Sequence, residues 1–237
     1  MQDGLGYALK FFLDRPAFLA ECDLYRSRTL GSLLPQVQAE YDPDDSKAPH
    51  TLNDSLGQPL PPCIAMERGE ALPDWSKRAK PDVFQSVAVL AHVAMRLRDM
   101  HEGGYVHRDI KPGNIILLPR ANRWTVIDFG CVASVGASAP LAYTATYAAP
   151  EVVAAADAGV KTIVADPAVD AWALGVVAYE LLTGQPAFNV FLEGRDSVCE
   201  SPLTPLLLSF KLDKRVPREE TRRCMRTVHM VHVSMRL

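Results

Sequence analysis

The feature that most restricts the fold is an apolar run, AWALGVVAY, which covers residues 171–179 and lies between Asp170 and Glu180. The segment from Asp170 to Thr183 is apolar nearly all round, which is typical of a helix enclosed by other helices. The run is too short to cross a bilayer, which takes about 20 residues, so no membrane span is predicted. We therefore expect a helix at the centre of a helical lobe. Its predicted core residues are Trp172, Leu174, Val176, Val177, Tyr179 and Leu182.

A smaller region of mixed strand and helix precedes this lobe. Residues 5–13, LGYALKFFL, have the composition of a buried strand, and apolar residues recur at helical spacing over 16–30. Further strands are predicted at 37–41 and in CIAMERGEAL, 63–72, on either side of a loop over 42–62 that is rich in Pro, Asp, Ser and Asn. The order of strand, helix and strands, followed mainly by helices, predicts an α+β chain with two lobes.

A long helix is predicted from Pro81 to Glu102, where apolar residues recur every three or four positions. Gly103 and Gly104 follow it and supply the left-handed conformations that end helices. Next come two predicted short strands and a loop-like region: 115–118, 124–128 and 130–150. A polar stretch, HRDIKPGN, therefore lies between the end of a helix and the start of a strand.

Composition excludes some classes of function. The chain of 237 residues has a formal net charge of −3, whereas nucleic-acid binders carry a strongly basic face, so no nucleic-acid partner is predicted. The five cysteines are scattered without a CxxC pair, which indicates reduced thiols in an intracellular protein. The N-terminus lacks the pattern of a signal peptide, so we expect a soluble cytoplasmic location.

Chemistry is concentrated in two short stretches. In HRDIKPGN, Asp109 can accept a proton, Lys111 can neutralise a phosphate, and Asn114 offers an amide oxygen to a hard cation such as magnesium. In IDFG, Asp128 ends an apolar strand, where a carboxylate is costly unless it has a partner, and a divalent cation is a good one. Together these residues suggest a phosphate and metal site.

These stretches resemble the eukaryotic-type serine/threonine protein kinase family. Four motifs occur in the family's order: HRD with a later Asn at 107–114, DFG at 128–130, APE at 149–151 and DAWALG at 170–175. The resemblance implies a protein-kinase-like fold, with a small N-terminal β-rich lobe and a larger, mainly helical C-terminal lobe. Lys111 followed by Pro112, and Thr144 before APE, favour serine/threonine over tyrosine specificity.

The resemblance assigns roles within the catalytic loop. Asp109 would orient the substrate hydroxyl and accept its proton, and Lys111 would steady the transferred phosphate. Asn114 and Asp128 would hold Mg²⁺, and ATP would be the phosphate donor. His107 is predicted to be a structural core residue and not a base.

In the small lobe, YALK resembles the family's lysine strand, so Lys10 is the candidate for binding the α- and β-phosphates of ATP. Glu21 is the candidate partner of Lys10 on the helix. The stretch CIAMERGEAL looks like the hinge where adenine binds. By that alignment Met66 is the gatekeeper, and Glu67 to Gly69 form the hinge.

The chain departs from the family pattern at both ends. Only nine residues precede Lys10, too few for the GxGxxGxV hairpin that covers the ATP phosphates, so the small lobe is expected to be truncated. The predicted organisation is a partial N-lobe and hinge over 1–70, a C-lobe over 71–209, and a poorly ordered basic tail over 210–237. The resemblance covers roughly residues 7–200. Arg222 or Arg223 could replace the arginine that pairs, in the family, with the glutamate matching Glu151.

Arg108 bears on regulation. In kinases of this type, an arginine before the catalytic aspartate belongs to a basic pocket that receives a phosphate from the loop after DFG. We therefore predict phosphorylation, by an upstream activating kinase, at one of four hydroxyls: Ser134, Ser138, Tyr143 or Thr146. The alternative is that all four are ordinary loop residues.

The predicted function is transfer of the γ-phosphate of ATP to a serine or threonine of a protein substrate. A pseudokinase or interaction module is the second hypothesis, favoured by the missing glycine-rich hairpin and opposed by the retained Lys10, Asp109, Asn114 and Asp128. A small-molecule phosphotransferase is the third hypothesis, and the set of DFG, APE and DAWALG opposes it. The substrate and the pathway are left open.

Overall fold

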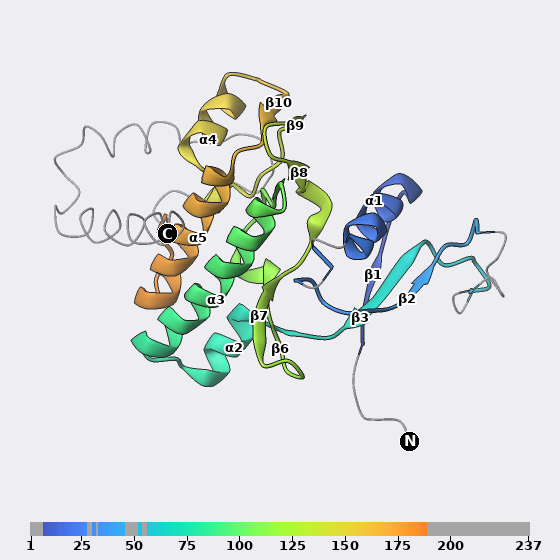
Figure 1. Ribbon diagram of the computed structural model, residues 1–237, viewed down its shortest axis with the longest axis horizontal. Helices are drawn as coiled ribbons and strands as arrows, with labels where there is room; N and C mark the ends of the chain where they lie inside the picture. Colours follow the sequence, from blue (N-terminus) through green and yellow to red (C-terminus); the bar gives the residue numbers. More distant parts are fainter. Residues whose placement is uncertain (1–6, 28–29, 32, 46–51, 54–55, 189–237) are drawn as a thin grey trace.

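A computed structural model describes residues 7–27, 30–31, 33–45, 52–53 and 56–188. These residues form two lobes joined by one extended strand segment (Figure 1). The predicted basic tail over 210–237, with Arg222 and Arg223, lies outside the described residues. The same is true of residues 1–6, so the predicted strand is described only from Tyr7 onward.

The small lobe is a three-stranded antiparallel sheet, in the order β1-β3-β2, with one helix packed against it (Figure 1). Its elements are β1 (Tyr7–Phe11), α1 (Arg15–Arg26), β2 (Val37–Tyr41) and β3 (Cys63–Glu67). Asp14 caps α1 by accepting a hydrogen bond from the Ala17 amide at 2.9 Å, and Pro16 occupies the first turn. Phe18 and Cys22, one turn apart, are buried against Ile64 of the central strand.

The large lobe contains four helices and several short strands in its described part. Its helices are α2 (Leu72–Ala79), α3 (Val83–Glu102), α4 (Pro150–Asp157) and α5 (Pro167–Thr183). Its strands are β4 (Glu70–Ala71), β5 (Tyr105–Val106), β6 (Ile115–Leu118), β7 (Arg123–Val126), β8 (Ala133–Ser134), β9 (Ser138–Pro140) and β10 (Thr162–Val164). Single 3-10 turns occur at Pro112–Asn114, Phe129–Cys131 and Ala145–Tyr147.

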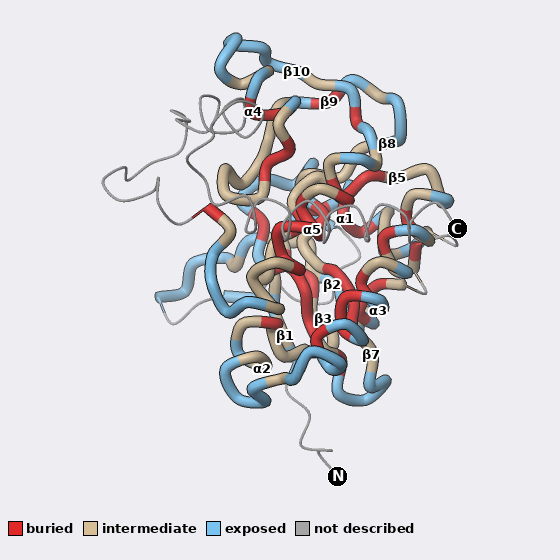
Figure 2. The backbone as a smooth tube through the Cα atoms, turned by 90° about the vertical axis from the view of Figure 1, so that its left-hand side faces the viewer, coloured by how far each residue is buried: buried red, intermediate tan, exposed pale blue. Residues whose placement is uncertain are grey.

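The predicted central helix is present as α5. Leu174, Val176 and Val177 are buried as predicted, and α5 packs beside α3 around the main core (Figure 2). Trp172 and Leu182 are only half-buried but pack against core clusters, whereas the half-buried Tyr179 belongs to none of the clusters of the described residues. A helix can be apolar all round and still expose part of its circumference, because its neighbours cover it unevenly.

The two ends of α3 show how far local signals decide a helix boundary, whereas α1, predicted over 16–30, already ends at Arg26. Asp82 and Gln85 form a reciprocal capping box at the start of α3. At its end, Gly104 is left-handed with φ 87°, whereas Gly103 stays right-handed with φ −72°, so the predicted left-handed pair is a single residue. The region 130–150, predicted as mostly loop, contains two short strands, β8 and β9, that pair with β5 and β10.

Candidate active site

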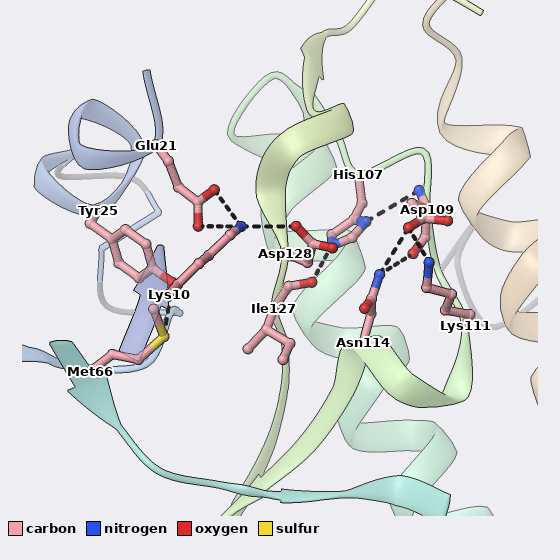
Figure 3. A network of polar contacts seen from close by, with 10 residues as sticks. All are labelled: Lys10, Glu21, Tyr25, Met66, His107, Asp109, Lys111, Asn114, Ile127 and Asp128. Carbon is pink, nitrogen blue, oxygen red and sulfur yellow. Dashed lines mark hydrogen bonds and ion pairs between the residues drawn. The ribbon is translucent and has the colours of Figure 1, made fainter. Parts of the chain in front are cut away.

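Two charged side chains of the small lobe meet a third from the large lobe between the lobes (Figure 3). Lys10 projects from β1, and its Nζ donates to both carboxylate oxygens of Glu21 on α1, at 2.9 and 2.6 Å. The same Nζ donates to Oδ1 of Asp128, after β7, at 2.9 Å. The sequence predicted Lys10 and Glu21 as partners, and the structure pairs them and also places Lys10 against Asp128.

Burial and pairing set the charges of this cluster. Burial alone would lower the pKa of Lys10, but the hydrogen bonds and charges of Glu21 and Asp128 outweigh it and raise this pKa above its ordinary value. Burial raises the pKa of Glu21, and the bond to Lys10 opposes that effect. For Asp128 burial is again opposed by Lys10, and the pKa falls below its usual value. The single Lys10 ammonium thus pairs with the carboxylates of both Glu21 and Asp128, so the cluster of three side chains carries a net negative charge.

A second cluster surrounds Asp109 in the loop before β6. Lys111 Nζ donates to Oδ2 of Asp109 at 2.7 Å, and the Thr144 hydroxyl donates to Oδ1 at 2.6 Å. The Asn114 amide nitrogen donates to Oδ2 at 3.1 Å and to the Asp109 carbonyl at 2.8 Å (Figure 3). These three residues hold the Asp109 carboxylate in one orientation. The sequence predicted Asp109, Lys111 and Asn114 as catalytic and also placed Thr144 at this aspartate.

Asp170 of α5 holds the loop that carries Asp109 through hydrogen bonds to its backbone. Its side chain, 1% exposed, accepts the His107 amide at 2.8 Å, the Arg108 amide at 2.7 Å and His101 Nε2 at 2.8 Å. Arg108 has a left-handed backbone with φ 70°, which is costly for a residue other than glycine unless its surroundings fix it. Sequence reasoning missed this role, although a charged residue beginning an apolar helix was a usable signal.

His107 is a structural residue, as predicted. It is completely buried, and its ring packs edge-on against Phe129 at 5.4 Å between centroids. Its Nε2 lies 3.0 Å from the Ile127 carbonyl, and its Nδ1 accepts the Asp109 amide at 3.3 Å. One nitrogen donates and the other accepts, which is the arrangement of a neutral imidazole, and burial lowers its pKa.

The predicted gatekeeper and hinge lie in β3 and in the residues that follow it. Met66 is buried and accepts a hydrogen bond from the Tyr25 hydroxyl of α1 to its sulfur at 3.6 Å. Glu67 ends β3, and Gly69 follows where the chain passes β6. A Cβ on Gly69 would lie 2.6 Å from Ile116 Cδ1 and 2.9 Å from the Leu117 carbonyl oxygen, so only glycine fits without movement.

The residues present fit a magnesium nucleotide. Asp128 and Asn114 supply oxygen atoms, which Mg²⁺ prefers, and two protein ligands suffice for an ion that keeps several waters. The Asp128 side chain is 47% exposed, which leaves its carboxylate open to a ligand. No group of three or more His, Cys, Asp or Glu residues that could hold a metal occurs within the described ranges. The site therefore fits Mg²⁺ bound jointly with phosphates and does not fit a preformed metal cage.

The cysteines of the described chain are not activated. Cys22, Cys63 and Cys131 are free thiols. Burial is the main cause that raises the pKa of Cys131, which follows the DFG stretch. It is thus no reactive thiol, as predicted.

Comparison with known proteins agrees with the geometry. A family model described as a protein kinase domain matches residues 64–225. The match begins at the end of the predicted partial N-lobe and ends within the predicted basic tail.

Individual relatives are serine/threonine kinases. The chain is 32% identical over 164 residues to the serine/threonine-protein kinase PknB of Mycolicibacterium smegmatis, covering 65% of this chain and 24% of that protein. It is 35% identical over 132 residues to PknA of Mycobacterium tuberculosis, covering 53% and 28%. Human myotonin-protein kinase is 40% identical over 104 residues, covering 42% and 16%. The chain thus spans less than a third of the length of each relative.

Solved structures include the kinase PK-1 of the Cydia pomonella granulovirus, with a TM-score of 0.65 and 17% identity over 98% of this chain and 82% of that one. At this identity the likeness shows the fold alone. Among the described helices, none is long and apolar enough to cross a membrane.

Proposed function

Because the chain belongs to the eukaryotic-type serine/threonine protein kinase family, we propose that it transfers the γ-phosphate of ATP to a serine or threonine hydroxyl of a protein substrate. The observation that carries this proposal is the contact of Lys10 with both Glu21 and Asp128, at 2.6 and 2.9 Å. It joins β1 and α1, which are neighbours in sequence, to the DFG stretch, which lies more than 100 residues further along the chain.

Lys10 would bind the α- and β-phosphates of ATP. Glu21 is buried, with 3% of its surface exposed, so its side chain cannot turn toward solvent. Its carboxylate therefore fixes the Lys10 ammonium in position. A fixed cation stabilises the negative charge that develops in the transition state more than a mobile one does, because it needs no reorganisation during the reaction. Met66, Glu67 and Gly69 would border the adenine, as the hinge of the family does.

Asp109 would accept the proton of the substrate hydroxyl. Its carboxylate is already oriented by Lys111, Asn114 and Thr144, so the base is in place before the substrate arrives. Lys111 would also neutralise charge on the transferred phosphate. Asn114 and Asp128 would hold Mg²⁺, which when bound neutralises the charge of the nucleotide phosphates.

A pseudokinase that binds partners but turns over little substrate is the second candidate. It is favoured by β1, which is an edge strand of the described sheet and exposes Tyr7, Leu9 and Phe11, at 51%, 58% and 47%. In the family, the glycine-rich hairpin over the phosphates would lie beside this strand.

Phosphotransfer from Mg-ATP to a generic basic peptide tests the proposal. The wild type is compared with Asp128→Asn and Asp109→Asn, and with Asp166→Asn, which removes a charge from the exposed cap of α5. We expect the first two variants to lose at least about 100-fold in rate, and Asp166→Asn to stay within about twofold of the wild type. Equal residual rates in wild type, Asp128→Asn and Asp109→Asn would reject catalysis and favour the pseudokinase.

A further inference from the structure

The segment between DFG and APE, residues 131–148 and here called the activation segment, is fixed by Arg108. Arg108 Nη1 donates to the Cys131 carbonyl at 3.1 Å, and Nη2 donates to the Pro140 carbonyl. One guanidinium therefore joins the start of the segment to its middle. Both acceptors are backbone oxygens, where the sequence predicted a phosphate.

The first part of the activation segment pairs with the strand that leads into the catalytic loop. In the β5–β8 pair, Tyr105 lies opposite Ser134 and Val106 opposite Ala133. Beyond the pair, the Val135 amide donates to the Gly104 carbonyl at 2.8 Å. Ser134, one of the predicted phosphorylation sites, is thus an exposed strand residue.

The middle part pairs with β10, the strand before α5 (Figure 1). The Ala165 amide donates to the Ala137 carbonyl at 2.9 Å, and the Leu141 amide donates to the Lys161 carbonyl at 2.9 Å. Partners alternate along an antiparallel ladder, so Ala139 and Ile163, opposite each other between these bonds, are also a hydrogen-bonded pair.

The last part is tied to the catalytic loop through Thr144, whose hydroxyl donates to Asp109 and accepts from Lys111 Nζ at 3.1 Å. The activation segment is therefore held along its whole length: to β5, to Arg108, to β10 and to Asp109. Every one of these bonds is made by the unmodified chain.

We propose that backbone pairing with β5 and β10 orders the activation segment of this protein without phosphorylation, with Arg108 bound to two carbonyl oxygens in place of a phosphate. Other kinases gain the ordering from charge-assisted bonds between such an arginine and a phosphate. In this chain the ladder supplies the order, so the segment needs no phosphate on Ser134, Ser138, Tyr143 or Thr146. The inference concerns regulation of the proposed kinase site, so it rests on the proposed function.

Amide hydrogen exchange on the full chain tests the inference without any turnover. The protein is treated with phosphatase, and its mass is checked to show that no phosphate remains. We expect the amides of Gly136, Leu141 and Ala165 to exchange at least about 100-fold more slowly than in an unstructured peptide. Exchange at the unstructured rate in phosphate-free protein would overturn the inference.

Two proline variants locate the cause of the protection. Ile163→Pro removes an amide that bonds to Ala139, whereas the Val164 amide, one position on, points away from β9, so Val164→Pro is the matched control. We expect Ile163→Pro to speed exchange of the Leu141 and Ala165 amides by at least about tenfold and Val164→Pro to change it by less than about threefold. Equal effects of the two variants would contradict the ladder.

A variant without acceptors separates this inference from the proposed function. Replacing Ser134, Ser138 and Thr146 by Ala and Tyr143 by Phe should leave both the exchange rates and any phosphotransfer within about twofold of the wild type. A protected segment in a protein without phosphotransfer would reject the proposed function and keep the ordering. Loss of exchange protection or of phosphotransfer in this variant would reject the inference that the activation segment is ordered without phosphorylation.

Discussion

Asp170 offers the sharpest test of how the catalytic loop is held. Its carboxylate, 1% exposed at the start of α5, takes one backbone amide on each oxygen: His107 on Oδ2 at 2.8 Å and Arg108 on Oδ1 at 2.7 Å. Changing Asp170 to Asn keeps one acceptor and turns the other into a donor that faces an amide. Changing it to Ala removes both acceptors.

The expected loss follows from the cost of leaving buried donors unpaired, about 1–3 kcal/mol for each. Asp170→Asn leaves one amide without an acceptor and should lower the free energy of unfolding by about 2 kcal/mol. Asp170→Ala leaves both amides and His101 Nε2 without this acceptor. The two amides alone should lower the free energy of unfolding by about 4 kcal/mol, a large share of the roughly 5–15 kcal/mol typical of a domain. The left-handed Arg108 adds to the effect, because the Asp170 bond helps to hold its strained φ of 70°.

Urea unfolding of the full chain measures both losses. With a slope of about 2 kcal/mol/M, the midpoint should fall by about 1 M for Asp170→Asn and about 2 M for Asp170→Ala. Asp166→Asn on the same helix is the control, because asparagine caps a helix as well as aspartate and the change should stay within about 0.5 kcal/mol. A loss below about 0.5 kcal/mol for Asp170→Ala would refute the view that this carboxylate supports the loop.

Two other predictions concern stability. Gly69→Ala should cost about 1–3 kcal/mol, since its Cβ would meet the Leu117 carbonyl oxygen at 2.9 Å, whereas a Cβ on Gly113 meets nothing within 4 Å and Gly113→Ala should cost less than about 1 kcal/mol; thermal melts of both variants compare them, and equal losses would contradict the contact. Burial lowers the pKa of His107, so the unfolded chain binds a proton below its ordinary pKa of 6.5 that the folded chain does not bind. This stability is therefore fully present above that pH and should fall by up to about 1.4 kcal/mol per pH unit below it. Urea midpoints between about pH 7.5 and about pH 5.5 should show the fall in the wild type and a smaller one in His107→Phe; an unchanged fall would assign it to other groups.

The ion cluster at Lys10 could be predicted because its members sit in elements with clear sequence patterns. Lys10 lies in an apolar strand and Glu21 on the buried side of an amphipathic helix, between Phe18 and Cys22. A strand and a helix that follow one another pack together, which limits where the two charges can meet. The resemblance to the kinase family named Glu21 as the partner, and its buried position agrees, because a buried charge needs a partner.

Short elements were missed where tertiary contacts, not local patterns, create them. Helix α2 has no side-chain cap, and its stability comes from packing, with Trp75 edge-on to Trp124 at 4.9 Å. Strands β9 and β10 are each three residues long and pair with each other, although the whole of α4 lies between them in the sequence. A three-residue strand has too little period to be recognised, and its partner is not adjacent in sequence.

Arg108 shows why a motif can fix a residue type and still leave its partner open. The sequence shows that a guanidinium precedes Asp109, and a guanidinium binds a phosphate or carbonyl oxygens with the same donors. Every residue of the activation segment carries a carbonyl, so no residue type marks the ones that reach Arg108. The turn at Gly136, with φ 77°, decides which carbonyls reach Arg108. It lies between β8 and β9, directs the chain along β10 and brings the Pro140 carbonyl to the guanidinium. The backbone course after DFG, more than the arginine itself, therefore decides whether such a kinase would need a phosphate.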